Sequence, residues 1–195
     1  MNLKVYQDPS ITPTLVLVDL QQEYVESGRS LGISDTEQSL ANCHALLQHA
    51  RNYGLPVAFT RWVQQSTFFN NGQGYSKWIE GFEPHGSDMI FDRAMPSCYS
   101  NEQFNEMMCH FGGKNAIIAG FTGSIACLST ILDGFHKRHD IKFIFDASAS
   151  HSLNGMTEGK AHESACDLIS LYAPVLSTQE WIKSYVPIIN NNWKK

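Results

Sequence analysis

The sequence has no apolar run near the roughly 20 residues that cross a bilayer, and its N-terminus has no cationic stretch followed by an apolar one. It also lacks an excess of positive charge, since 14 Lys and Arg stand against 19 Asp and Glu, for a formal net charge of −5. Proteins that bind nucleic acid normally carry a basic face that neutralises phosphates. We therefore expect neither a membrane nor a nucleic acid as a partner.

Cysteine is scarce and is not arranged in pairs. The five cysteines form no CxxC motif and are an odd number, which is typical of a reducing compartment, so we expect a cytoplasmic protein. The eight histidines likewise show no ligand spacing apart from the HxxH at 136–139, which we interpret as the solvated end of a helix. No metal and no cofactor are expected.

The 195 residues, of which 43% are hydrophobic, suit one domain over 1–195. Short apolar runs alternate with amphipathic segments. Strands are predicted at 15–20, 55–60, 88–92, 115–121, 142–147 and 174–178, and helices at 36–53, 100–111, 124–138, 157–170 and 178–185. This alternation predicts an α/β fold of three layers, with a six-stranded, mainly parallel sheet between helices. Ligands bind beyond the carboxyl ends of the strands in such sheets.

Aromatic residues gather near predicted strand ends and in the polar segment 63–87, which interrupts the regular alternation. An insertion of this length within a compact domain is more often functional than not. The aromatics would either wall a small apolar cavity or belong to ordinary core or a subunit interface. They are Tyr24, Trp62, Phe68, Phe69, Trp78, Tyr99 and Phe121.

Two features at predicted strand ends could carry chemistry. Asp19 ends an almost wholly apolar segment, where a carboxylate either caps a neighbouring loop or acts as a general acid or base. The segment GFTGSIACLST at 120–130 leads from a strand into a helix. With Ser124 as N-cap, its free backbone N–H groups would bind an anionic oxygen; the alternative is simply a tight turn.

Four segments follow one another along the chain: LVLVDLQQEY, DRAMPSCYSNEQF, IIAGFTGSIACLSTILDGF and FIFDASASHS. In order and spacing they resemble the isochorismatase-like hydrolase (cysteine hydrolase) superfamily, and the resemblance covers 12–182. The resemblance implies the Rossmann-like fold of that superfamily, a small-molecule substrate, and a homodimer or homotetramer. It also implies a cis peptide bond between Phe121 and Thr122.

The superfamily's amidases use an Asp-Lys-Cys triad, of which this chain keeps one member. Asp19 matches the acid, whereas Arg93 stands at the position of the lysine and Ala126 at that of the cysteine. An alanine methyl group cannot attack a carbonyl. Cys127 is the next residue, and because adjacent helical residues point about 100° apart, we expect it to face the core.

The chain most resembles the isochorismatase branch, which has a small residue, Gly, at the position of Ala126 and cleaves a vinyl ether without a covalent intermediate. By this resemblance Asp19 would protonate the enolpyruvyl methylene carbon. Arg93 would bind the substrate carboxylate or the transition state. The backbone of the turn through Ala126 would bind an oxyanion. The residues expected to bind substrate are Tyr24, Arg61, Trp62, Trp78, Tyr99, Phe121, Thr122, Gly123 and Ile125.

Two other functions stay open. Because two of three triad residues differ, the chain could be a degenerate member that binds a small anion without chemistry. A weaker alternative is an amidase whose nucleophile has moved to Cys127 or Cys98. An arginine beside Asp19 is also expected to lower the pKa of its carboxyl, which would oppose general-acid catalysis.

Overall fold

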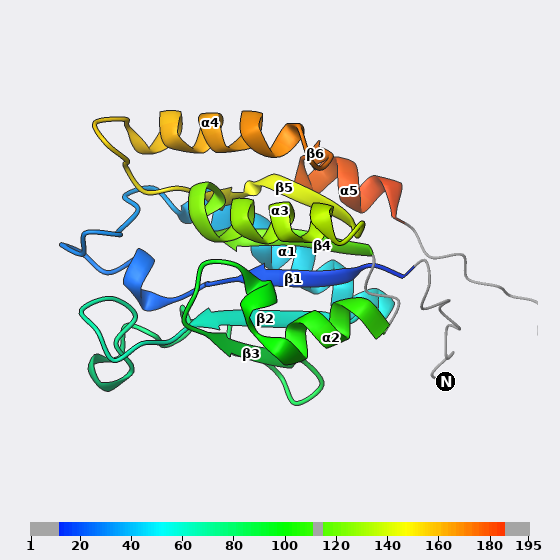
Figure 1. The fold of residues 1–195 in the computed structure, drawn as a ribbon, viewed down its shortest axis with the longest axis horizontal. Coiled ribbons are helices and arrows are strands. Elements are labelled where there is room, and N and C mark those ends of the chain that lie inside the picture. The colour runs from blue at the N-terminus through cyan, green and yellow to red at the C-terminus, as the bar shows by residue number, and fades with distance from the viewer. Residues whose placement is uncertain (1–11, 111–114, 186–195) are drawn as a thin grey trace, which may run out of the picture.

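The computed structural model describes residues 12–110 and 115–185 and contains a six-stranded, all-parallel sheet (Figure 1). The strand order is β3-β2-β1-β4-β5-β6. The strands are β1 (Thr14–Val18), β2 (Val57–Trp62), β3 (Met89–Arg93), β4 (Asn115–Phe121), β5 (Asp140–Ala149) and β6 (Val175–Leu176). The predicted α/β class and six-stranded parallel sheet are confirmed.

Helices cover both faces of this sheet and complete the three layers (Figure 1). They are α1 (Glu37–Tyr53), α2 (Glu102–His110), α3 (Leu128–His136), α4 (Glu158–Ser170) and α5 (Thr178–Ser184). Helices α1 and α5 pack on one face, and α2, α3 and α4 on the other. The helix predicted over 124–138 is in fact two elements, because a π-helix over Gly123–Cys127 precedes α3.

Strand β1 lies at the centre of the sheet, and all five of its residues are buried. Because side chains alternate along a strand, Leu15 and Leu17 join the cluster under α1, while Val16 and Val18 join the cluster under α2 and α3. A strand that is apolar on both faces is expected wherever helices cover both sides of a parallel sheet.

The ends of β1 and β4 approach each other closely at Gly120, which pairs with Val18. Gly120 has φ +108°, and a Cβ atom built on it would lie 2.1 Å from the Val18 carbonyl oxygen. No side chain fits there without a backbone shift. This contact fixes the start of the turn after β4 against the end of β1, where Asp19 follows.

Within the described ranges, no helix has both the length and the apolar character that crossing a membrane requires.

We predict that Gly120→Ala lowers the free energy of unfolding by about 3 kcal/mol or more, because the methyl group meets backbone on β1. Gly155→Ala is the matched control, since Gly155 also has positive φ (+82°), but a Cβ atom added there would have no neighbour within 4 Å. The control should cost only about 1 kcal/mol. Urea unfolding measures both, and equal losses would contradict the close-approach interpretation.

Candidate active site

The candidate site begins at Asp19, the residue directly after β1. Its φ of +48° lies in the left-handed region that non-glycine residues rarely adopt. The Asp19 N–H donates to the Thr60 carbonyl at 3.0 Å, and the Asp19 carbonyl accepts the Gln21 N–H at 2.7 Å. Such a conformation costs about 1–3 kcal/mol and persists where its surroundings hold it in place.

A buried ion pair joins Asp19 to Arg93 at the end of β3. Arg93 Nη2 donates to Asp19 Oδ2 at 2.7 Å, and the two side chains are 1% (Arg93) and 0% (Asp19) exposed. Arg93 Nη1 donates to the Met95 carbonyl at 2.8 Å, and the guanidinium lies 5.3 Å from the centre of the Trp62 ring. The structure thus brings together the two charged residues selected from the sequence, across the end of β2.

Burial controls the acidity of Asp19. Removal from water raises the pKa of its carboxyl to about 6, against the opposing effect of Arg93, which lowers it. Arg93 lowers the pKa of Asp19 as predicted, but the effect of burial is larger, so the carboxyl remains suited to general-acid catalysis. At pH 7 about a tenth of a carboxyl with this pKa is protonated, so Asp19 can exchange a proton near neutral pH.

Several buried polar atoms of the pair and of two other predicted site residues have no hydrogen-bond partner within 12–110 and 115–185. They are Asp19 Oδ1, Arg93 Nε, Trp62 Nε1 and Thr122 Oγ1. An unmade buried hydrogen bond costs about 1–3 kcal/mol, so such groups call for a ligand or water that satisfies them. They comprise a carboxylate acceptor, two N–H donors and one hydroxyl.

In the turn after β4, several backbone N–H groups already donate hydrogen bonds within the protein. The peptide bond between Phe121 and Thr122 is cis. The Thr122 carbonyl accepts N–H groups from Ile125 at 3.3 Å and Cys127 at 3.0 Å, and the Ser124 N–H donates to Ser150 Oγ at 3.1 Å. These three N–H groups are therefore not free for an anionic oxygen, while binding of an oxyanion by the backbone through Ala126 stays a prediction.

The predicted N-cap at Ser124 is also wrong. Ser124 lies inside the π-helix that starts at Gly123, which follows Thr122 without a side-chain cap. A π-helix forms its hydrogen bonds over five residues instead of four, and short π-helical turns are frequent at functional sites. The sequence pattern alone did not distinguish this turn from the start of an ordinary α-helix.

Ala126 and Cys127 both point into the core between the sheet and helices α2 and α3, and both are 0% exposed. The Cys127 Sγ lies 3.7 Å from the Gly120 carbonyl oxygen, and burial raises the pKa of its thiol well above the ordinary range. The prediction that Cys127 faces the core is confirmed. Cys98 is equally buried, and its Sγ donates to Thr60 Oγ1 at 3.4 Å.

Four of the predicted aromatic residues form a continuous row beside the ion pair. Trp62 stacks on Phe69, with ring centres 5.2 Å apart and planes 7° apart. Phe69 meets Tyr24 edge-on at 5.3 Å, and Tyr24 meets Phe121 edge-on at 5.8 Å. Phe69 brings the segment 63–87 over the site.

The remaining aromatic candidates lie elsewhere. Tyr99 packs on Phe104 in the cluster under α2, and its hydroxyl oxygen is 2.6 Å from His139 Nδ1. Trp78 meets the Phe59 ring at 5.5 Å, and Phe68 is 38% exposed. The structure does not bring Tyr99 into the aromatic row.

Arg61 has a partner of its own. It lies within β2, and not beyond it as the sequence suggested, and donates from Nε and Nη2 to both carboxylate oxygens of Asp92 at 2.9 and 2.7 Å. Its guanidinium also lies 5.2 Å from the centre of the Trp78 ring. The structure therefore does not place Arg61 with Asp19 and Arg93 in one site.

Two buried polar residues that support the site were missed. Gln21 donates from Nε2 to the carbonyls of Trp62 at 2.8 Å and Ser76 at 3.0 Å, and its Oε1 accepts the Trp62 N–H at 2.8 Å. Glu23 accepts the Phe69 N–H at 3.0 Å and pairs with Arg29. Both follow Asp19 closely, but nothing in their spacing indicates these partners.

No cluster of three or more His, Cys, Asp or Glu side chains suited to a metal ion occurs in 12–110 or 115–185.

Comparison with known proteins gives one consistent result. Residues 13–180 match the isochorismatase domain family. An uncharacterized isochorismatase family protein of Bacillus subtilis, YddQ, is 24% identical over 89% of this chain and all of its own length. The ureidoacrylate amidohydrolase RutB of Pseudomonas syringae is 22% identical over 69% of each chain.

Solved structures share the fold. An isochorismatase from Pseudomonas putida superposes with a TM-score of 0.78 at 22% identity, covering 89% of this chain and 91% of its own. An isochorismatase-like hydrolase from Alkaliphilus metalliredigens gives a TM-score of 0.80 at 14% identity, covering 90% of this chain and 99% of its own. At these identities the likeness extends to the fold alone.

We predict that Arg93→Met lowers the free energy of unfolding by about 3 kcal/mol at pH 8, because it leaves the Asp19 carboxylate buried without a partner. Loss of the cation raises the Asp19 pKa in the folded state further above its unfolded value. Protonation then relieves the folded state at low pH, so the deficit should shrink at pH 5.

The control is Arg61→Met, which removes the partly exposed pair with Asp92 and should cost less than about 1 kcal/mol at either pH. Urea unfolding of both variants at pH 5 and pH 8 tests the prediction. A loss for Arg93→Met that is the same at both pH values would show that the charge of Asp19 is not its cause.

Proposed function

Because the chain belongs to the isochorismatase family, we propose that it is a hydrolase of a small carboxylated molecule that acts without a covalent cysteine intermediate. The observation that carries this proposal is Asp19, a buried carboxyl with a pKa raised to about 6 and with one oxygen that has no partner in the described part of the chain. A carboxyl of this kind can donate a proton near neutral pH in a site from which water is excluded. The proposed substrate resembles isochorismate.

Asp19 supplies the proton for vinyl-ether hydrolysis. The proton moves from Asp19 to the methylene carbon of the enolpyruvyl group, which leaves an oxocarbenium-like centre at the ether carbon. Water adds to that carbon and returns a proton to the carboxylate. In the resulting hemiketal the bond to the ring oxygen then breaks, the hydroxyl becomes the keto group of pyruvate, and its proton passes to the ring oxygen, which leaves as the hydroxyl of a dihydroxy-cyclohexadiene acid.

Arg93 and its neighbours bind the substrate in this proposal. Arg93 Nε has no hydrogen-bond partner among the residues that the structure describes, although Nη1 and Nη2 do, so one edge of the guanidinium can still donate to a substrate carboxylate. Trp62 Nε1 and Thr122 Oγ1 supply further hydrogen bonds. The rings of Tyr24 and Phe121 provide the apolar wall.

An amidase mechanism with a relocated thiol receives less support. Cys127 is the residue next to Ala126, the position of the family nucleophile. Its raised pKa disfavours the thiolate that acyl transfer needs. Its Sγ is directed at the Gly120 carbonyl in the core. Cys98 is also fully buried.

A second candidate function is binding of a small anion without chemistry. It is favoured by the ion pair itself, since Arg93 holds Asp19 at 2.7 Å and both are buried. In this case Arg93 and Thr122 would bind the ligand, and Asp19 would serve only to orient Arg93. Catalysis and simple binding therefore differ in what Asp19 does with its proton.

We predict that the purified protein releases pyruvate from isochorismate and that Asp19→Asn lowers kcat by at least about 100-fold, because the amide cannot donate the proton. Asp92→Asn is the control, because Asp92 is 47% exposed and pairs with Arg61 outside the site. Pyruvate release is followed with a coupled assay, and ligand binding by Asp19→Asn is measured by calorimetry.

Binding of isochorismate without pyruvate release by the unaltered protein would support the second candidate. Turnover that survives in Asp19→Asn would contradict the role of Asp19. Loss of turnover on treatment with iodoacetamide, together with its persistence in Asp19→Asn, would support the relocated thiol.

We also predict that kcat/KM falls as the pH rises through about 6, by about tenfold per unit at higher pH. The proton donor must be protonated in the free enzyme, and the Asp19 carboxyl loses its proton over this range. Steady-state rates from pH 5 to pH 9 measure the profile. A rate that rises with pH over this interval would indicate a general base or a thiolate instead.

A further inference from the structure

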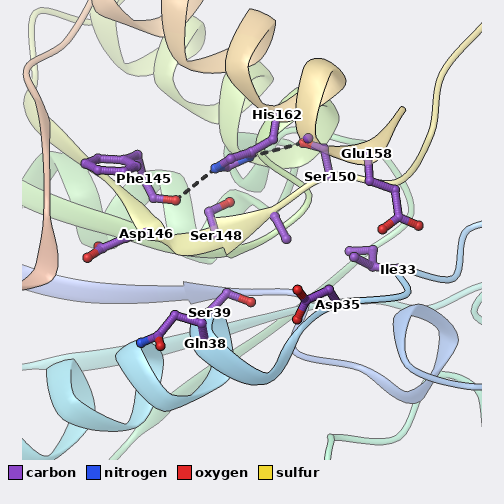
Figure 2. Close-up of a pocket in the computed structure, with 12 residues that line it drawn as sticks. Ile33, Asp35, Gln38, Ser39, Phe145, Asp146, Ser148, Ser150, Glu158 and His162 are labelled. Carbon is purple, nitrogen blue, oxygen red and sulfur yellow. Dashed lines mark hydrogen bonds between the residues drawn. The ribbon is translucent and has the colours of Figure 1, made fainter. Parts of the chain in front are cut away.

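A pocket of about 370 Å³ lies at the carboxyl end of β5, between the N-terminal ends of α1 and α4 (Figure 2). Its volume is in the range of small-molecule sites. It is lined by Ile33, Asp35, Gln38, Ser39, Phe145, Asp146, Ser148, Ala149, Ser150, Glu158, Gly159 and His162. None of the residues proposed above for catalysis or substrate binding lines it.

The lining carries negative charge. Asp35, Asp146 and Glu158 contribute carboxylates, and the described lining includes no lysine or arginine. His162 does not offset them, because burial lowers the pKa of its ring in spite of the contact of its Nε2 with the Phe145 carbonyl at 2.9 Å, which raises it. Carboxylates in a concave site concentrate a negative potential that attracts cations.

Two of the carboxylates are held in place by the protein and one is not. Glu158 accepts hydrogen bonds from the N–H and hydroxyl of Ser34, and Asp146 Oδ1 accepts both the N–H and the hydroxyl of Thr178. Asp35 is exposed and has no hydrogen-bond partner within the described residues. Figure 2 shows Asp35 and Glu158 toward one end of the pocket and Asp146 toward the other.

The separation of the carboxylates indicates the kind of cation. They do not form a cluster that could hold one metal ion, in the part of the chain that the structure describes. Charges placed apart match a ligand that carries separate positive groups. Ile33, Ala149 and Phe145 add apolar surface for the carbon chain between such groups.

We propose that this pocket binds a small organic cation with amino groups at both ends of a short aliphatic chain. This site goes beyond the proposed function, since it needs neither Asp19 nor Arg93. It does share a wall with the turn after β4: Ser150 Oγ accepts the Ser124 N–H at 3.1 Å, and Ser148 Oγ donates to the Gly120 carbonyl at 2.6 Å. An occupant would therefore rest against side chains that hold the turn.

Three four-carbon probes that differ in their end groups test the proposal: putrescine, butanediol and succinate. Titration calorimetry at low ionic strength should show saturable binding of one putrescine per chain and no binding of the other two. Asp35→Asn and Glu158→Gln should each weaken putrescine about fivefold, as expected for loss of one carboxylate–ammonium contact. Asp35→Asn removes no hydrogen bond within the described residues, so a folding defect does not confound it.

Glu163→Gln is the matched control, because Glu163 is exposed on the same helix as Glu158 and does not line the pocket. Its affinity for putrescine should equal that of the unaltered protein. Asp19→Asn should also bind putrescine normally, which separates this proposal from the proposed function. Failure of putrescine to saturate, equal binding of butanediol, or equal weakening by Glu163→Gln would overturn it.

Discussion

The buried ion pair between Asp19 and Arg93 is the interaction on which the rest of the site depends. Asp19 follows β1 and Arg93 ends β3, so their contact spans the end of the intervening strand β2. Two charges removed from water are costly unless each has a well-placed partner. The pair therefore links the ends of β1 and β3 across β2. The stability of this end of the sheet depends on whether the Asp19 carboxyl is protonated.

The same packing that protects the pair also sets its chemistry. Gln21 binds the backbone of Trp62 on both sides, which fixes the ring that lies over Arg93. The stack of Trp62 on Phe69 extends this apolar cover. Exclusion of water then raises the pKa of Asp19 in spite of the neighbouring cation, because the loss of hydration outweighs the attraction.

Periodicity made the fold predictable, and the resemblance to the superfamily's triad predicted that Asp19 and Arg93 meet, although β2 lies between the two strands concerned. The net direction of the Asp19 pKa was not predictable, since it depends on how completely packing removes water. The separate location of Tyr99 and the partners of Gln21 depend on contacts far apart in the sequence. The acidic pocket likewise combines three separate segments of the chain.

The energetic cost of the buried polar groups in the site supports the proposal that it binds a polar ligand. The positive φ of Asp19, and each of the four buried polar atoms that lack a partner among the described residues, cost about 1–3 kcal/mol, and the whole stability of a domain is only about 5–15 kcal/mol. A ligand that satisfies these atoms would recover much of that cost on binding. Catalysis then requires one thing more, a proton on Asp19, and a pKa near 6 makes that proton available close to neutral pH.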